Sequence, residues 1–398
     1  MGNRPRILIS GAGIAGLTLA YWLKRYGFEP TIVEKALELR AGGYMIDFWG
    51  LGFDVAEKMA LLQKLGEAHY DIPELDYVDQ HGKRKGGLSI IKMREAVNFR
   101  HYNLLRSDLE RVLYDIVAPD VEIRFGQSIE EIEQDAREVR VTLTDGSSEP
   151  YDLLVGADGL HSNVREKLYG DESEFERYMG YYTSSFTIDN YLGDDRMFKS
   201  YSTPGKQIGL YSIAEGRMAT FFIFKEEERL DISYHDTKAQ KKLLTKVFKD
   251  EGWESRRILD QMESAPDFYF DSVSQIYLQP WSRGRTTLVG DAAHCVSLLA
   301  GQGSALAMAS AYVLAGELRE AEGNHEIAYR RYEELMMPEV LRTRRLAQEF
   351  ADEFVPPTGF AIWKRNHLSR LMPLMMRSFV KRFMETAVTL KDYEAPVP

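Results

Sequence analysis

The sequence has one cysteine, no long apolar run and no excess of basic residues, and each shortage excludes a class of protein. The single Cys295 among 398 residues excludes an internal disulfide and a cysteine-based zinc site, which fits a reducing compartment. No run approaches the ~20 consecutive apolar residues of a membrane span, and we expect no signal peptide because the first residues lead directly into an apolar strand. With 50 basic and 61 acidic residues, the formal charge is −11, which argues against nucleic acid as a partner. We therefore expect a cytoplasmic protein.

What remains is a composition typical of folded proteins. A hydrophobic content of 44% and a charged content of 28% argue against disorder. The length suits two or three domains that share contacts rather than one small core. We expect the protein to be a monomer or a weak dimer.

A glycine-rich turn near the start of the chain is the most informative stretch. The apolar run at 7–9 predicts a buried strand, and Gly11-x-Gly13-x-x-Gly16 then opens a segment with helical spacing of apolar residues. These glycines permit a tight turn, a close backbone approach to a pyrophosphate, and close packing of helix on strand. Glu34 ends the next apolar run, where a carboxylate can bind both hydroxyls of an adenosine ribose. The stretch predicts a dinucleotide site, for either NAD or FAD.

Two later motifs also lead from a strand into a glycine turn. The run at 153–155 precedes Gly156-Ala-Asp158-Gly159, and the run at 286–289 precedes Gly290-Asp291. A carboxylate at Asp291 can accept hydrogen bonds from sugar or ribityl hydroxyls. The first motif therefore predicts a second strand–turn–helix unit, and the second predicts a further ligand-binding turn.

Gly301-Gln302-Gly303 stands just before a segment rich in small residues that we predict to be helical. The N-terminus of such a helix offers free N–H groups to phosphate or carbonyl oxygens. His294 and Cys295 lie between this turn and Asp291, and we expect them to pack beneath the site, since no partner carboxylate or second histidine is indicated.

Three charged residues in other segments can be interpreted either as ordinary surface or turn residues or as parts of a site. Arg40 and Asp47 stand in a turn-rich segment before a helix expected at 54–64, and without further context they are a surface arginine and a turn aspartate. Arg106 precedes Ser107, the expected cap of a helix at 104–116. It is either a surface arginine or a guanidinium that holds a phosphate or a flavin carbonyl edge.

The remaining segments predict an antiparallel sheet and a helical end. Alternating pieces at 75–100 predict hairpins, and the aromatic-rich region 180–270 predicts a mostly antiparallel sheet whose rings form a core or one wall of a ligand pocket. Residues 327–350 and 360–390 read as helices. The second is basic and amphipathic, so it either packs between domains or touches a membrane surface.

In this order, the three glycine motifs resemble those of the class A flavoprotein monooxygenases, the family of p-hydroxybenzoate hydroxylase. The short chain, the Gly-Gly-x-x-x-Asp segment that ends at Asp47, and the helical end look most like the tetracycline-inactivating and polyketide-hydroxylating members. The resemblance implies an α/β fold in which a three-layer ββα, Rossmann-like FAD-binding domain carries an inserted, mostly antiparallel β-sheet substrate domain and a C-terminal helical segment. The expected division is 1–74, 102–179 and 271–330 for the FAD-binding domain, 75–101 and 180–270 for the substrate domain, and 331–398 for the C-terminal segment.

The resemblance also implies roles for individual residues. The turn from Gly11 to Gly16 would hold the FAD pyrophosphate, Glu34 the adenosine ribose, Arg106 the flavin side, and Asp291 the region between ribityl chain and pyrophosphate. Asp47 matches an acid that approaches the FAD in the tetracycline-inactivating branch. The other residues of the expected cofactor site are Ile14, Ala15, Lys35, Arg40, Asp158, Gly290, Gly301, Gln302 and Gly303, of which Arg40 and Asp158 are also linked to NADPH. No catalytic residue and no metal ligand is nominated.

The implied reaction is an FAD-dependent oxygenation. NADPH or NADH would reduce a tightly but non-covalently bound FAD, O₂ would add to form a flavin C4a-hydroperoxide, and one oxygen atom would enter an aromatic or polycyclic, polyketide-like substrate. The cofactor supplies this chemistry, so a dry pocket that holds the substrate matters more than acid–base residues.

One departure from the family pattern leaves alternatives open. The family usually has a proline three residues before the glycine that is Gly301 here, and this chain has Leu298. A flavin-dependent reductase or halogenase shares the FAD domain, although the Trp-x-Trp-x-x-Pro segment of the halogenases does not occur in this sequence. A flavin-binding module that has lost turnover is the second alternative.

Overall fold

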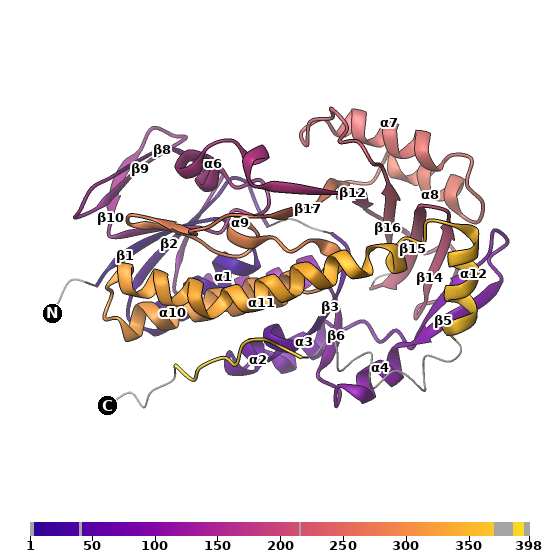
Figure 1. Cartoon of the computed structure of the whole chain (residues 1–398), viewed down its shortest axis with the longest axis horizontal. Coiled ribbons are helices and arrows are strands. Elements are labelled where there is room, and N and C mark those ends of the chain that lie inside the picture. Colours follow the sequence, from indigo (N-terminus) through magenta and orange to yellow (C-terminus); the bar gives the residue numbers. More distant parts are fainter. Residues whose placement is uncertain (1–3, 40–41, 215, 370–384, 394–398) are drawn as a thin grey trace.

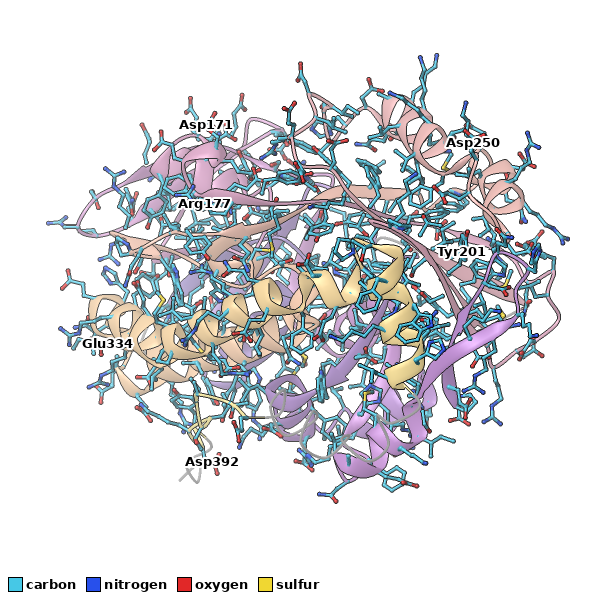
Figure 2. The ribbon with its side chains drawn as sticks, turned by 45° about the vertical axis from the view of Figure 1, so that its right-hand side comes forward. Asp171, Arg177, Tyr201, Asp250, Glu334 and Asp392 are labelled. Atoms are coloured by element: carbon cyan, nitrogen blue, oxygen red, sulfur yellow. The ribbon has the colours of Figure 1, made fainter. Side chains whose placement is uncertain are left out.

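The computed structural model describes residues 4–39, 42–214, 216–369 and 385–393. Two large β-sheets lie at opposite ends of the molecule, and the long helix α11 (His325–Phe354) extends from one to the other (Figure 1). Charged side chains such as those of Asp171, Asp250 and Glu334 project outward at the periphery of the molecule (Figure 2), as expected for a protein with this many charged residues.

The first sheet has the predicted first strand at its centre. Five strands run parallel in the order β19, β11, β1, β2, β7, and β18 pairs antiparallel at one edge. Ile7, Leu8 and Ile9 of β1 are fully buried, as expected for a parallel strand that is covered on both faces. The strands are β1 (Arg6–Ser10), β2 (Glu29–Glu34), β7 (Glu122–Phe125), β11 (Leu153–Gly156), β18 (Ser282–Arg283) and β19 (Thr286–Leu288).

Two further layers cover this sheet (Figure 1). One is a small antiparallel sheet of β8 (Ile129–Gln134), β9 (Val139–Leu143) and β10 (Ser148–Tyr151). The other consists of the helices α1 (Ile14–Arg25), α5 (Arg106–Val117) and α10 (Gly303–Glu320). Trp22 of α1 and Tyr312 of α10 are fully buried with their ring centroids 4.8 Å apart, so these two helices share one apolar core.

The second sheet is mostly antiparallel. Its order is β17, β12, β16, β15, β14, β4, β5, with β13 also paired to β16, and β4 on β14 is its one parallel pair among the described residues. Aromatic residues such as Phe186, Phe222 and Phe248 form a separate core between this sheet and two helices. These elements are β4 (Glu74–Val78), β5 (Arg84–Ser89), β12 (Glu176–Ser185), β13 (Thr187–Asp189), β14 (Phe198–Thr203), β15 (Lys206–Ile213), β16 (Arg217–Lys225), α7 (Thr237–Phe248), α8 (Ser255–Met262) and β17 (Tyr269–Ile276).

The remaining elements connect the two sheets or cover them. They are the ribbon of β3 (Met45–Trp49) and β6 (His101–Leu105), the helices α2 (Gly50–Lys58), α3 (Leu62–Glu67), α4 (Ile90–Ala96), α6 (Asn163–Tyr169), α9 (Asp291–His294) and α12 (Gly359–Leu368), and the 3₁₀ turns η1 (Glu172–Glu174) and η2 (Leu298–Ala300). The predicted α/β fold, with its three-layer unit, its mostly antiparallel sheet and its C-terminal helices, is confirmed. The domain boundaries stay a prediction; β12 begins at Glu176 and β17 ends at Ile276.

Several predicted helix limits are wrong. The helix expected at 54–64 is two helices, because Ala60 between α2 and α3 has a φ of +58° and breaks the run. Ser107 is not a cap, since α5 begins one residue earlier, directly after the extended Leu105 at the end of β6. Residues 90–96 form α4 instead of part of a hairpin.

The predicted helix at 360–390 is also wrong where the chain is described. The helix α12 ends at Leu368, and residues 385–390 are not helical. Residues 370–384, which include most of the basic amphipathic stretch, lie outside the described residues, as does Arg40.

Candidate functional site

The glycine turn between β1 and α1 is built as the motif predicts. Gly11 has a φ of +109°, and a Cβ there would lie 2.5 Å from the carbonyl oxygen of Ala157. A Cβ on Gly16 would lie 2.0 Å from the carbonyl oxygen of Gly11, closer than any real contact. Both positions therefore require glycine for the turn to close and for α1 to pack on β1.

The N-terminus of α1 is open to an anion. Among the described residues, no side chain caps this helix and its first turn has no acidic residue. Gly13 is the N-cap, and a Cβ at Gly13 would lie 3.5 Å from Glu110 Oε1 and 3.7 Å from Arg106 Nη2. The absence of a side chain at Gly13 therefore leaves the free N–H groups of α1 accessible beside a guanidinium, as a diphosphate requires. Ile14 and Ala15 form the buried first turn behind it.

Glu34 ends β2 next to this turn. Its carboxylate accepts hydrogen bonds from the backbone N–H groups of Ala12 and Ala36, each at 2.9 Å. The residue is only partly buried, and a carboxylate has about four acceptor positions, so Glu34 can also accept from ligand hydroxyls. Lys35, the next residue, is exposed.

Arg106 and Asp291 come together from distant parts of the chain. Arg106 begins α5 and its Nη2 lies 2.9 Å from Oε1 of the buried Glu110. The carboxylate of Glu110 raises the pKa of Arg106, against the effect of burial, so the guanidinium stays charged. Asp291 begins α9 after Gly290, whose φ is +65°. Burial raises the pKa of Asp291, and the charge of Arg106 counteracts this.

The start of α10 is a second open helix N-terminus. Gly301 has a φ of +61°, and a Cβ on Gly301 or Gly303 would have no heavy atom within 4 Å among the atoms described. Gln302 is the buried N-cap, and in the described structure this helix has no side-chain cap and no acidic residue in its first turn. The backbone here can approach the edge of a flat ligand.

Asp158 has several partners within its own turn. It accepts from Ser162 Oγ, from the N–H of Val164 at 3.1 Å and from Ser10 Oγ at 3.4 Å, and burial raises its pKa. These bonds tie the turn after β11 to the end of β1. Asp158 therefore positions this turn.

Asp47 lies on β3 and is held from β6. Its Oδ1 accepts from His101 Nε2 at 2.9 Å and from Asn103 Nδ2 at 2.8 Å, while 54% of the side chain remains exposed. Among the described residues, the second carboxylate oxygen accepts no hydrogen bond and can make another contact. His101 and Asn103 were not predicted to take part, because cross-strand neighbours cannot be read from sequence spacing alone.

Aromatic residues that the sequence did not single out for the site face this cluster. Tyr44 has its ring centroid 6.0 Å from that of Tyr269 and 6.5 Å from that of Phe221, and Tyr211 accepts a hydrogen bond from the N–H of Met45. Burial raises the pKa of Tyr44 to about 12 and that of Tyr269 well above its usual value, so both phenols remain neutral. The only feature of the sequence that pointed to these residues was the high aromatic content of the predicted antiparallel sheet at 180–270.

His294 and Cys295 are buried beneath the site, as expected. Burial lowers the pKa of His294 to about 3, and the Cys295 thiol lies 3.5 Å from the carbonyl oxygen of Ser274. In the ranges that the structure describes, no three His, Cys, Asp or Glu side chains are grouped to hold a metal ion, and no helix has the length and apolar character to cross a membrane.

These features define a protein with a site for a dinucleotide. The chain matches the family model described as "FAD binding domain" over residues 4–326. It is 34% identical over 400 residues to a flavin-dependent monooxygenase of Legionella longbeachae, which covers 99% of this chain and 100% of the relative. It is also 37% identical to a flavin-dependent monooxygenase of an unknown prokaryotic organism, over 89% of this chain and 91% of that one.

Solved structures agree with these relatives. The crystal structure of tetracycline destructase Tet(51) has a TM-score of 0.85 and 33% identity, covering 98% of this chain and 100% of that chain. For tetracycline destructase Tet(55) the TM-score is 0.85 and the identity 32%, covering 99% of this chain and all of that one. The chain belongs to the FAD binding domain family, and it is a flavin-dependent monooxygenase that binds FAD.

Proposed function

We propose that the protein uses NADPH or NADH to insert one oxygen atom of O₂ into an aromatic or polycyclic, polyketide-like small molecule, with tetracycline-like compounds as leading candidates. The observation that carries this proposal is the junction of the two sheets, where Tyr44, Phe221 and Tyr269 face Arg106 and Asp291. Aromatic rings beside a charged cluster suit a flat ligand with polar edges.

The adenosine end of FAD is assigned to the first glycine turn. Gly11 and Gly16 close the turn, and the N–H groups of α1 beyond Gly13 would bind the diphosphate together with Arg106. Glu34 would accept from the ribose hydroxyls. The neighbouring residues of this subsite are Ile14, Ala15 and Lys35.

The flavin end is assigned to the later motifs. Asp291 would accept from ribityl hydroxyls, and the backbone of Gly301, Gln302 and Gly303 would donate to the pyrimidine edge of the ring. Asp47 would approach the cofactor through its free carboxylate oxygen. When bound, the flavin supplies the redox chemistry and the activation of O₂.

The residues of the chain provide position and exclusion of water. Arg106 is fixed by Glu110, so its charge stays at one place beside the cofactor. Tyr44 and Tyr269 are neutral, partly buried phenols that can donate hydrogen bonds to a substrate carbonyl or enolate. A dry, preorganised junction favours oxygen transfer to the substrate over release of peroxide.

The substrate class is proposed from the two destructase structures, which are more than 30% identical to this chain. Their printed names concern tetracycline; for this chain the same class of fused, oxygenated rings is a hypothesis. The aromatic junction supports it, since several rings can pack against extended apolar surface.

Substrate-stimulated oxidation of NADPH and NADH tests the proposal. The panel should contain simple phenols, quinolones, and tetracycline- and anthracycline-like polycycles, and each product should be weighed by mass spectrometry. We expect a polycyclic compound to accelerate NAD(P)H oxidation and to gain one oxygen. A yellow protein whose NAD(P)H oxidation no candidate accelerates would contradict the proposal and favour a flavin-binding module without turnover.

A further inference from the structure

A chain of polar side chains leads from the site junction to the protein surface. Tyr269, at the junction, donates to Asp271 Oδ2 at 3.5 Å. Asp271 in turn lies 3.2 Å from His161 Nε2, and the other ring nitrogen of His161 lies 2.8 Å from Glu172 Oε1. These residues come from β17, from the turn after β11 and from η1, so the chain forms only in the folded protein.

The two ends of this chain have different surroundings. At the inner end, the Tyr269 ring faces Tyr44 at 6.0 Å between centroids and lies within the electrostatic reach of Arg106 and Cys295. At the outer end, the His161 side chain is 19% exposed and stacks at 4.6 Å on the ring of Tyr234, which is 50% exposed. The hydrogen-bonded path from His161 to Tyr269 therefore connects solvent to the place where the substrate is proposed to bind.

The groups around His161 favour its charged form. Burial alone lowers the pKa of this imidazole, but the hydrogen bonds to Asp271 and Glu172 raise it to about 9. Glu172 also pairs with the buried Arg165, and the ring of Tyr234 stacks on the imidazole. His161 is thus a cation at neutral pH, with one proton directed at Asp271.

The proposed reaction needs such a proton. Substrate, O₂, NAD(P)H and one H⁺ give hydroxylated substrate, NAD(P)⁺ and water, so each turnover takes one proton from solvent. We propose that Tyr269, Asp271 and His161 form the path by which this proton reaches the site. This inference rests on the proposed function, and it assigns roles to three residues outside the expected cofactor set.

The proton transfers along these three side chains balance. His161 gives its Nε2 proton to the carboxylate of Asp271, which passes a proton to the phenol oxygen of Tyr269 while Tyr269 releases its own hydroxyl proton to the acceptor in the site. The imidazole then takes a proton from solvent, and every group returns to its starting form. Tyr269 must turn its hydroxyl from Asp271 to the site for each transfer, as the long 3.5 Å contact allows.

The test starts from holoenzyme reduced with dithionite, which is then reoxidised by O₂. Flavin absorbance reports the reoxidation, and a pH-indicator dye in the solution simultaneously reports the uptake of protons by the enzyme. This reaction takes up a proton to form H₂O₂ and needs neither substrate nor NAD(P)H, so it is readable even if the substrate proposal fails. The variants are His161→Gln, Tyr269→Phe and His161→Ala with added imidazole. His81→Gln, an exposed histidine in the β4–β5 hairpin, is the control.

We expect His161→Gln and Tyr269→Phe to slow proton uptake about 100-fold, the lower end of what a positioned proton donor contributes. The wild-type rate should fall as pH rises through about 9, and this fall should vanish in His161→Gln. Imidazole should restore the rate of His161→Ala, while His81→Gln should match the wild type. FAD affinity should change less than twofold in all variants.

Two results would overturn the inference. One is a His161→Gln enzyme with the wild-type rate and pH profile. The other is a variant whose defect is confined to a weaker FAD affinity or a higher KM for NAD(P)H, since this would make His161 a nucleotide-binding residue. A wild-type enzyme that oxygenates no candidate, but shows these proton-uptake effects, would contradict the substrate proposal alone.

Discussion

Glu34 shows how one side chain can both shape the cofactor site and bind the ligand. Its carboxylate already fixes the backbone on both sides through Ala12 and Ala36. Removing it therefore loosens the glycine turn and also removes the proposed ribose acceptor. The effect on FAD affinity should exceed that of removing any other carboxylate on the same strand.

We predict that Glu34→Ala weakens FAD binding by about 1.5–3 kcal/mol, roughly 10- to 100-fold in Kd, the range for hydrogen bonds to a charged group. The Kd is measured by titrating the apoprotein with FAD and monitoring the quenching of flavin fluorescence. Glu29→Ala, at the exposed far end of β2, is the matched control and should leave Kd unchanged. Equal affinities for the two variants would remove Glu34 from the site.

His294 predicts a pH dependence of stability. Burial lowers its pKa from 6.5 to about 3 in the folded protein, so the unfolded chain binds this proton first as pH falls. The stabilising contribution of neutral His294 is complete above pH 6.5 and is lost progressively as pH falls toward 3. Between these limits the free energy of unfolding should fall by about 1.4 kcal/mol per pH unit for this one group.

Urea denaturation at several pH values from 6.5 to 4.5 tests this dependence. The variant His294→Gln should show a shallower loss of stability over this range, whatever its stability at pH 6.5. His81→Gln should keep the wild-type slope. Parallel slopes for wild type and His294→Gln would show that His294 is not buried as a neutral group.

At the residue scale, the sequence predicted geometry that depends on local spacing. The glycine turn and Glu34 lie within one strand–turn–helix–strand unit, so their geometry follows from short-range rules. Tyr269 and Asp271 are neighbours on β17, but His161 could not be grouped with them in this way, because it meets them only through the packing of β17 against the turn after β11. The polar partners of Asp47 were missed for the same reason.

At the scale of elements, α10 connects the proposed flavin end of the site to the end of the described chain. Tyr393 packs directly on Gly316 of this helix, where a Cβ would lie 2.3 Å from its ring. Tyr393 also donates to the buried Glu317 at 2.7 Å, and Lys391 pairs with the same carboxylate at 2.5 Å. Residues 385–393 therefore pack against α10 and pair with its buried carboxylate.

We predict that Gly316→Ala destabilises the protein by about 1–3 kcal/mol, as overpacking does, although alanine is the better helix former. In a Tyr393→Ala background the same change should be neutral or stabilising, since the clash is gone. Chemical denaturation of the four proteins gives this coupling. Gly359→Ala in α12, where no heavy atom lies within 4 Å of the added Cβ among the atoms described, is the control.

Additive effects of Gly316→Ala and Tyr393→Ala would contradict this packing. The sequence did not predict it, because the helix predicted at 360–390 ends before Tyr393 and the contact of Tyr393 with α10 is distant in sequence. Helix limits failed at other places where a tertiary contact decides them. The helix α5 begins at Arg106 because its N–H bonds to the carbonyl oxygen of Tyr44, 3.2 Å away, across the β3–β6 ribbon.

At the scale of the whole molecule, the proposed site is the junction of two sheets with separate cores. The parallel sheet supplies the open helix ends, and the antiparallel sheet supplies Phe221 and Tyr269. The helix α11 runs along both, and it contacts β17 through the bond from Gln275 to the carbonyl oxygen of Arg344 at 3.1 Å. The order of the three motifs was enough to predict this architecture. The residues at the junction could be identified only from the folded structure.

The central claim is that this protein transfers one oxygen atom from O₂ to an organic substrate. The most direct measurement is turnover under ¹⁸O₂ with the best substrate of the panel, with the oxygen isotopes of the product determined by mass spectrometry. The account predicts one ¹⁸O atom in each product molecule and NAD(P)H consumed in equal amount. Product that carries oxygen from water, or NAD(P)H oxidation that yields only H₂O₂ with unchanged substrate, would contradict it.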